Sequence, residues 1–118
     1  MSIILHITTR ESWKSAEPTG AYTTPSLGDQ GFIHLSTPAQ TPGTANLLFE
    51  GRRDLVLLVV DTDRLTAELK YEDTEEIGQD FPHLYGPLLC DAVVDVLAFP
   101  PGADGVFRLP ESRWFEAE

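Results

Sequence analysis

The chain has little cysteine, few basic residues and no long apolar run. Cys90 is the single cysteine in 118 residues, so an internal disulfide and a metal cluster built from several thiolates are both excluded. The longest apolar run covers residues 55–60, which is far too short to cross a bilayer. No basic segment followed by a long apolar stretch begins the sequence, so we expect no secretory signal and a cytoplasmic location.

The scarcity of basic residues gives the chain a strongly acidic balance. Nineteen Asp and Glu residues stand against eight Lys and Arg, a net charge of −11. Such a surface repels phosphate backbones, and the adjacent pair Arg52-Arg53 is too small to form a basic patch, so we expect no nucleic-acid partner. The length and the 42% hydrophobic content fit a single domain over residues 1–118 with a core of its own.

The apolar pattern predicts an α+β fold with a mainly antiparallel sheet and two short helices. Residues 54–61 are apolar on both faces, so we expect this strand at the centre of the sheet. The other expected strands are residues 2–7, 31–36, 69–72, 92–99 and, at an edge, 106–109. We expect helices from Thr8 or Thr9 to Pro18 and from Thr41 or Gly43 to Phe49, a capping box at residues 37–40, and loops at 25–31 and 73–80.

Three histidines are present, and each lies in an apolar stretch. His6 lies in residues 3–8, His34 in residues 31–36 and His83 in residues 81–86. Surface histidines would be scattered through polar segments, so we expect these three to converge on one pocket.

Other polar groups are expected beside these histidines. Strand alternation places Ser36 on the face of His34 and, if residues 81–86 are extended, Tyr85 on the face of His83. Glu72 ends a short strand that leads toward His83 and adds a carboxylate. Together these groups suit a small-molecule ligand with ribose hydroxyls, an amide or a small anion.

Three alternatives compete with this ligand site. The histidines could only complete hydrogen bonds in the core, since a buried imidazole needs two partners. Ser36 could be a nucleophile, but no Gly-x-Ser-x-Gly motif surrounds it. Three histidines suffice for a catalytic zinc, but neither His-x-His nor His-Glu-x-x-His occurs, so we expect no metal.

The chain also resembles a known family. The bacterial and plant family called domain of unknown function 952 is similar to it over roughly residues 3–99. The resemblance is carried, in order, by His6-Ile7-Thr8, Trp13, residues 31–36 (GFIHLS), Gln40, Tyr71-Glu72 and residues 81–88 (FPHLYGPL).

This resemblance implies a fold similar to the ADP-ribosylation superfamily, whose members bind NAD in the cleft of a split, mostly antiparallel sheet. Residues 6–8 and 32–36 are similar to two strands of the tRNA 2′-phosphotransferases in that superfamily. By this likeness NAD or a related nucleotide is the expected cofactor, and the protein would transfer or hydrolyse ADP-ribose. The implied cofactor-binding residues are His6, Thr8, His34, Ser36 and Tyr85, with His6 on a ribose hydroxyl.

The implied catalytic residues are Glu72 and His83, in the place of a late glutamate of the superfamily. Arg10 is the only arginine near the first two motifs, whereas the phosphotransferases use arginines to hold phosphate. This scarcity motivates the alternative of a non-catalytic small-molecule binding module with a degenerate cleft.

Overall fold

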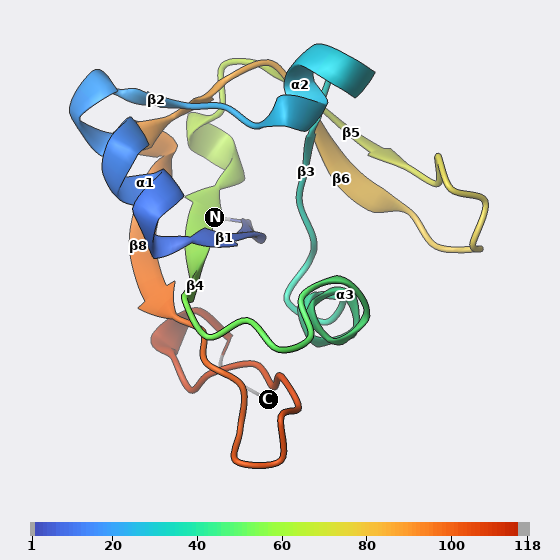
Figure 1. The fold of residues 1–118 in the computed structure, drawn as a ribbon. Coiled ribbons are helices and arrows are strands. Elements are labelled where there is room, and N and C mark those ends of the chain that lie inside the picture. The colour runs from blue at the N-terminus through green and yellow to red at the C-terminus, as the bar shows by residue number, and fades with distance from the viewer. Residues whose placement is uncertain (1, 116–118) are drawn as a thin grey trace.

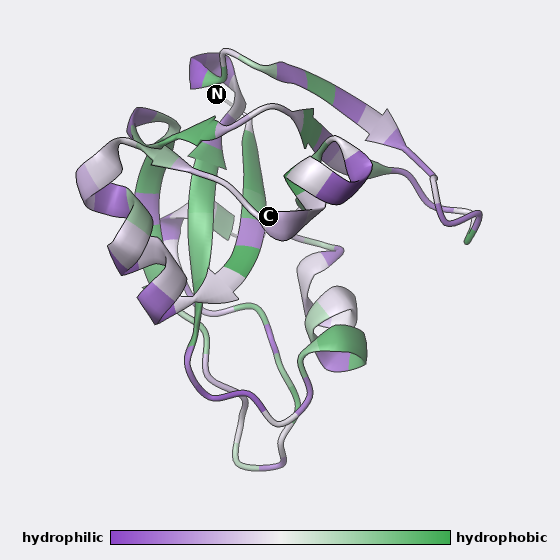
Figure 2. Ribbon diagram, turned by 45° about the horizontal axis from the view of Figure 1, so that its top comes forward, coloured by the Kyte–Doolittle hydropathy of each residue, from purple (hydrophilic) through white to green (hydrophobic). Residues whose placement is uncertain are grey.

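Strand β4 (Leu55–Asp61) is the middle strand of a three-stranded sheet in the computed structural model, which describes residues 2–115. It pairs antiparallel with β1 (Ile3–Thr9) on one side and with β8 (Val93–Ala98) on the other (Figure 1). Every residue of β4 is buried, and Figure 2 shows the strand as hydrophobic along most of its length. The predicted central strand is confirmed.

Two smaller antiparallel sheets complete the strands. One has the order β3-β6-β5, from β3 (Ile33–His34), β6 (Phe81–Tyr85) and β5 (Glu68–Glu72). The other pairs β2 (Ala21–Tyr22) with β7 (Leu88–Leu89), a strand that the sequence did not indicate. The predicted α+β class and its mainly antiparallel pairing are therefore confirmed.

One isolated bridge joins β1 to the chain just after β3. Leu5 and Ser36 exchange two backbone hydrogen bonds, each with an N–O distance of 2.8 Å. Because His6 follows Leu5 and His34 precedes Ser36 by two residues, this bridge brings the first two histidine segments together.

Alternate residues of β1 and β4 pack on opposite faces of the central sheet. On one face Ile4 and Leu58 pack with Trp13 and with Ile33 and Leu84 of the β3-β6-β5 sheet. On the other face the core consists of Leu5, Ile7, Leu55, Leu57 and Val59, with Ala45, Phe99 and Phe107. Because side chains alternate between the two faces of a strand, β1 and β4 contribute residues to both cores.

Three α-helices are described rather than the two expected. The helices α1 (Arg10–Ala16) and α3 (Thr41–Leu48) lie where helices were predicted, whereas α2 (Pro25–Gln30) replaces a predicted loop. Pro25 in its first turn and Gly31 just after its end, at φ 91°, are the usual boundaries of a short helix. Short 3₁₀ turns cover Glu17–Thr19, Thr62–Arg64, Cys90–Ala92 and Arg113–Phe115. No helix within residues 2–115 is long and apolar enough to span a membrane.

The capping-box prediction at residues 37–40 is confirmed in its contacts. The Gln40 side-chain oxygen accepts from the Thr37 backbone N–H at 3.0 Å, and the Thr37 hydroxyl oxygen accepts from the Gln40 backbone N–H at 3.3 Å. These residues form a turn, and α3 begins immediately after it.

The predicted edge strand at residues 106–109 is wrong. The side-chain amide of Asn46 takes both backbone groups of Phe107: its oxygen accepts from the N–H at 2.8 Å, and its NH₂ donates to the carbonyl at 3.0 Å. A side chain 61 positions away therefore satisfies the backbone groups that would otherwise pair with a neighbouring strand.

Asp95, the polar exception within β8, holds the C-terminal segment. It lies where the register between β4 and β8 shifts, opposite Val59. Its carboxylate accepts from the Trp114 indole N–H at 2.8 Å and from the Val96 backbone N–H at 2.8 Å. The polar residue in this strand thus docks an aromatic side chain of the tail.

Replacing Asp95 with alanine is expected to lower the free energy of unfolding by about 1–2 kcal/mol, because the half-buried indole N–H loses a charged acceptor. Urea denaturation followed by tryptophan fluorescence measures this loss, and native emission should shift to longer wavelength as Trp114 detaches. Asp91→Ala is the matched control, since Asp91 is exposed. Equal stability and unchanged emission in Asp95→Ala would show that this contact does not hold the tail.

Candidate functional site

A cavity of about 420 Å³ lies between β1, β3, β6, the end of α3 and the segment that joins β5 to β6. All three histidines line it, together with Ser36 and Glu72. We call it the histidine cavity. Its volume falls in the range of small-molecule sites. Of the other predicted site residues, Tyr85 and Thr8 lie one hydrogen bond or more behind the lining.

His6 uses both of its ring nitrogens inside the protein. Its Nδ1–H donates to the His34 carbonyl at 2.7 Å, and its Nε2 lies 2.8 Å from the Tyr22 hydroxyl. The same hydroxyl lies 2.8 Å from the Thr8 hydroxyl. Burial lowers the pKa of His6 to about 4, so the ring is neutral at physiological pH. His6 and Thr8 thus tie β1 to β2 and β3, and neither ring nitrogen of His6 is left for a ligand.

His83 has a different environment. It lies directly opposite His34 in the β3–β6 pair, with ring centroids 5.3 Å apart. The Glu72 Oε1 atom accepts from His83 Nδ1–H at 2.9 Å and from the Tyr85 hydroxyl at 2.6 Å. These hydrogen bonds, from Tyr85 first and then His83, lower the pKa of Glu72 and keep it ionised. The imidazole proton is therefore held on Nδ1.

The other nitrogen of His83, Nε2, has no hydrogen-bond partner within residues 2–115. The side chain is only 3% exposed, and the Phe32 ring stacks on it with a centroid distance of 4.0 Å. In the described part of the chain every fully enclosed polar side-chain atom has a partner. Since His83 lines the cavity, we conclude that its Nε2 lone pair opens into it.

His34 is exposed at the edge of the cavity. Its Nε2 lies 2.8 Å from the side-chain oxygen of Gln30, the last residue of α2. Desolvation, followed by the neighbouring His83, lowers the pKa of His34. Gln30 was not predicted as a site residue, because residues 25–31 were expected to form a loop.

Ser36 is buried, and its hydroxyl proton is used in a hydrogen bond inside the protein. The Thr41 hydroxyl donates to the Thr37 carbonyl at 2.8 Å, so the Ser36 hydroxyl, 2.7 Å from Thr41 Oγ1, must be the donor in that pair. Ser36 therefore presents only lone pairs to the cavity. Its bonding resembles a helix-start contact rather than an activated nucleophile.

Negative charge surrounds the histidine cavity. Glu72, Asp73 and Glu75 line it, and no lysine or arginine does so among residues 2–115. Asp73 also orders the turn before β6, because its two oxygens accept from the Ile77 and Gly78 backbone N–H groups at 2.9 and 2.7 Å. The acidic loop predicted at residues 73–80 is thus part of the site. In the described residues no three His, Cys, Asp or Glu side chains gather closely enough to hold a metal ion.

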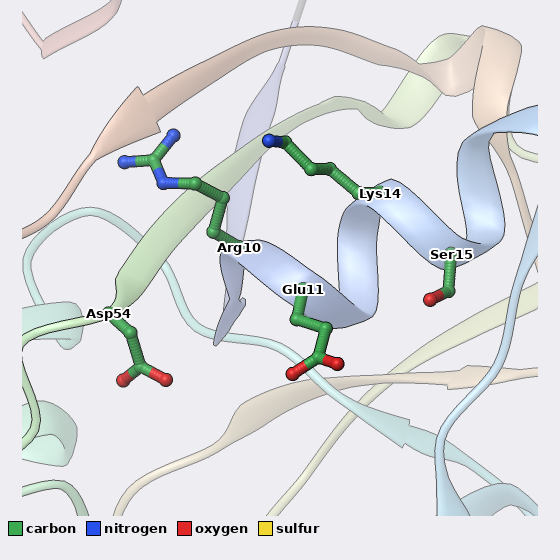
Figure 3. A pocket seen from close by; sticks show the side chains of 5 residues that line it. All are labelled: Arg10, Glu11, Lys14, Ser15 and Asp54. Atoms are coloured by element: carbon green, nitrogen blue, oxygen red, sulfur yellow. The ribbon is translucent and has the colours of Figure 1, made fainter.

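A second hollow lies beside α1, away from these histidines. Figure 3 shows its lining, in which Arg10 and Lys14 point to one side and Glu11 and Asp54 to the other. All of its lining side chains are exposed, and Asp54 is paired with Arg52 at 2.8 Å. Mixed, solvated charges make a weak binding site. Arg10, the arginine nearest the first motifs, therefore faces this hollow and not the histidine cavity.

Fold and cavity together define an α+β protein with antiparallel sheets and a histidine-lined pocket. The chain belongs to the family described as "Protein of unknown function (DUF952)", whose model matches residues 7–96, and the family resemblance seen in the sequence is confirmed. No curated protein matches the chain.

Solved structures of a relative share the fold. The crystal structure of protein CC0527 from Caulobacter crescentus is 38% identical, with a TM-score of 0.82 over 92% of this chain and 95% of that one. The solution NMR structure of CC0527 is also 38% identical, with a TM-score of 0.78 over 90% and 91% of the two chains.

Proposed function

We propose that the histidine cavity binds a small organic molecule and that His83 Nε2 accepts a hydrogen bond, and then a proton, from it. The observation that carries this proposal is one buried imidazole with one nitrogen bound to Glu72 and the other open to the cavity. A carboxylate that holds the proton on Nδ1 leaves Nε2 as the basic atom.

The surroundings of His83 suit a general base. When a ligand O–H or N–H gives its proton to Nε2, the imidazolium that forms is stabilised by the ionised Glu72. Phe32 stacked on the ring and Tyr85 bonded to the same Glu72 oxygen restrict both partners. This is the acid–base role that the resemblance implied for Glu72 and His83, with His83 as the group that touches the ligand.

NAD or a related nucleotide is the second candidate ligand, with transfer or hydrolysis of ADP-ribose as the reaction. The motive for this candidate is the ADP-ribosyltransferase-like fold that the family resemblance implies. His34 and Ser36 lie in the cavity, as a nucleotide site of that kind would require. The acidic lining counts against a pyrophosphate, which needs cationic groups or free backbone N–H groups around it.

A thermal-shift screen of the untagged protein tests both candidates. The ligands are NAD, ADP-ribose, adenosine and nicotinamide at millimolar concentration, and a bound ligand raises the melting temperature. We expect His83→Gln to reduce the shift of any ligand that binds, whereas Arg53→Gln, a change at an exposed site outside the cavity, should preserve it.

A shift with NAD or ADP-ribose together with released nicotinamide would select the nucleotide reaction. A shift with adenosine or nicotinamide alone would select binding without phosphate recognition. A ligand that stabilises the wild type and His83→Gln equally would contradict the role of His83.

A further inference from the structure

The buried polar atoms that face the histidine cavity are hydrogen-bond acceptors. His83 Nε2 is an acceptor because the ring proton lies on Nδ1, bound to Glu72. Ser36 Oγ is an acceptor because its proton goes to Thr41. Both side chains are 3% exposed, so they form the deep part of the cavity. A ligand group that reaches them must bring its own N–H or O–H, because two acceptors facing each other repel.

The carboxylates in the cavity lining outnumber the nearby cations: Glu72, Asp73 and Glu75 line it, whereas Lys70 lies behind the lining, near Glu72 and over the Tyr85 ring. Glu72 lies directly behind His83, and Asp73 and Glu75 follow it along the lining. The Glu75 carboxylate is close enough to His34 to favour its protonated form. With no lysine or arginine in the lining among the described residues, this potential attracts a cation and repels an anion.

Apolar side chains surround the mouth of the cavity. Leu47 and Leu48 at the end of α3 are 80% and 67% exposed, and Ile77 in the segment before β6 is 61% exposed. All three line the cavity although they come from two separate elements. Exposed apolar groups that gather at a concave site usually mark a binding surface.

We infer that the histidine cavity selects an amine with an apolar body: the ammonium enters first toward His83, and the body rests on Leu47, Leu48 and Ile77. This inference rests on the proposed binding function and adds the chemical class of the ligand. The ammonium N–H donates to Nε2 while the carboxylates balance its charge. A neutral alcohol satisfies the acceptors but not the charge, and a carboxylate satisfies neither.

Three probes that share a phenyl ring separate the contributions of charge and hydrogen bonding. They are phenethylamine, 2-phenylethanol and phenylacetate. Each is titrated into ¹⁵N-labelled full-length protein while the backbone amide shifts of the cavity lining are followed. We expect phenethylamine to bind at least about tenfold more tightly than phenylacetate, with 2-phenylethanol between them.

The variant Glu75→Gln isolates the charge. It should weaken phenethylamine about two- to fivefold, the usual effect of one exposed charge, and leave 2-phenylethanol unchanged. Glu11→Gln is the matched control, because Glu11 is equally exposed but lines the other hollow (Figure 3).

The outcomes test the amine preference separately from the proposed binding of a small molecule in the histidine cavity. Tighter binding of phenylacetate than of phenethylamine, with shifts in the lining, would overturn the amine preference and keep the cavity as a binding site. Shifts confined to residues outside the lining, or no binding of any probe together with a flat thermal-shift screen, would overturn both.

Discussion

Lowering the pH from 6.5 to 4 is expected to lower the free energy of unfolding by about 3 kcal/mol through His6 alone. The pKa of His6 is about 4 in the folded protein, against 6.5 for an unperturbed histidine. Between these values the unfolded chain binds a proton at this position and the folded protein does not. The stability that depends on neutral His6 is therefore complete above pH 6.5 and is lost as the pH falls toward 4.

Urea denaturation at successive pH values measures this loss, and NMR titration of the His6 ring protons gives the pKa directly. His34, whose pKa is also lowered, and carboxylates with lowered pKa such as Glu72, whose unperturbed value is 4.5, add their own losses within this window, so the difference between the wild type and His6→Gln isolates the contribution of His6. In His6→Gln the slope of stability against pH should flatten between 6.5 and 4. A His6 midpoint near 6.5 in the folded protein would contradict the neutral, enclosed ring.

Replacing His6 with alanine is expected to lower the free energy of unfolding by about 3–4 kcal/mol. The change leaves a cavity in place of a buried ring and removes the partners of the His34 carbonyl and the Tyr22 hydroxyl. Chemical denaturation at pH 7.5 measures the loss.

His34→Ala is the matched control for this substitution. His34 is exposed and its ring makes one hydrogen bond, to Gln30, so its removal should cost less than about 1 kcal/mol. Similar losses in the two variants would show that His6 and His34 do not differ in the way their contacts indicate. The contrast matters because alanine at His6 cannot test ligand binding alone, whereas alanine at the exposed His34 can.

The local parts of the fold could be predicted from the sequence. Six consecutive apolar residues mark β4, and a Thr followed three residues later by Gln marks the turn before α3. Both signals lie within one segment, so no distant contact is needed to interpret them. The strand alternation that placed Ser36 with His34, and Tyr85 with His83, is a signal of the same kind.

The wrong edge strand, and two features that the sequence left unexplained, depend on contacts between distant residues. Phe107 lies in a sequence of good strand formers, yet Asn46 satisfies its backbone. The polar residue in β8 is explained by Trp114, which lies 19 positions away. The sequence also does not distinguish His6, which only makes internal hydrogen bonds, from the other two histidines. Its partner Tyr22 lies in a two-residue strand that has no distinctive sequence pattern.

The segment between β5 and β6 supplies Asp73, Thr74, Glu75 and Ile77 to the histidine cavity, yet its residues 73–80 contribute to neither core cluster (Figure 1). Apart from Asp73, which orders the turn, substitutions there change the charge and shape of the mouth at little cost to folding, whereas changes at His83 or Ser36 disturb a packed interior. Variation in this one segment could therefore give family members different ligands while His83 and Ser36 stay in place. To engineer a new specificity, mutagenesis should begin with residues 73–80.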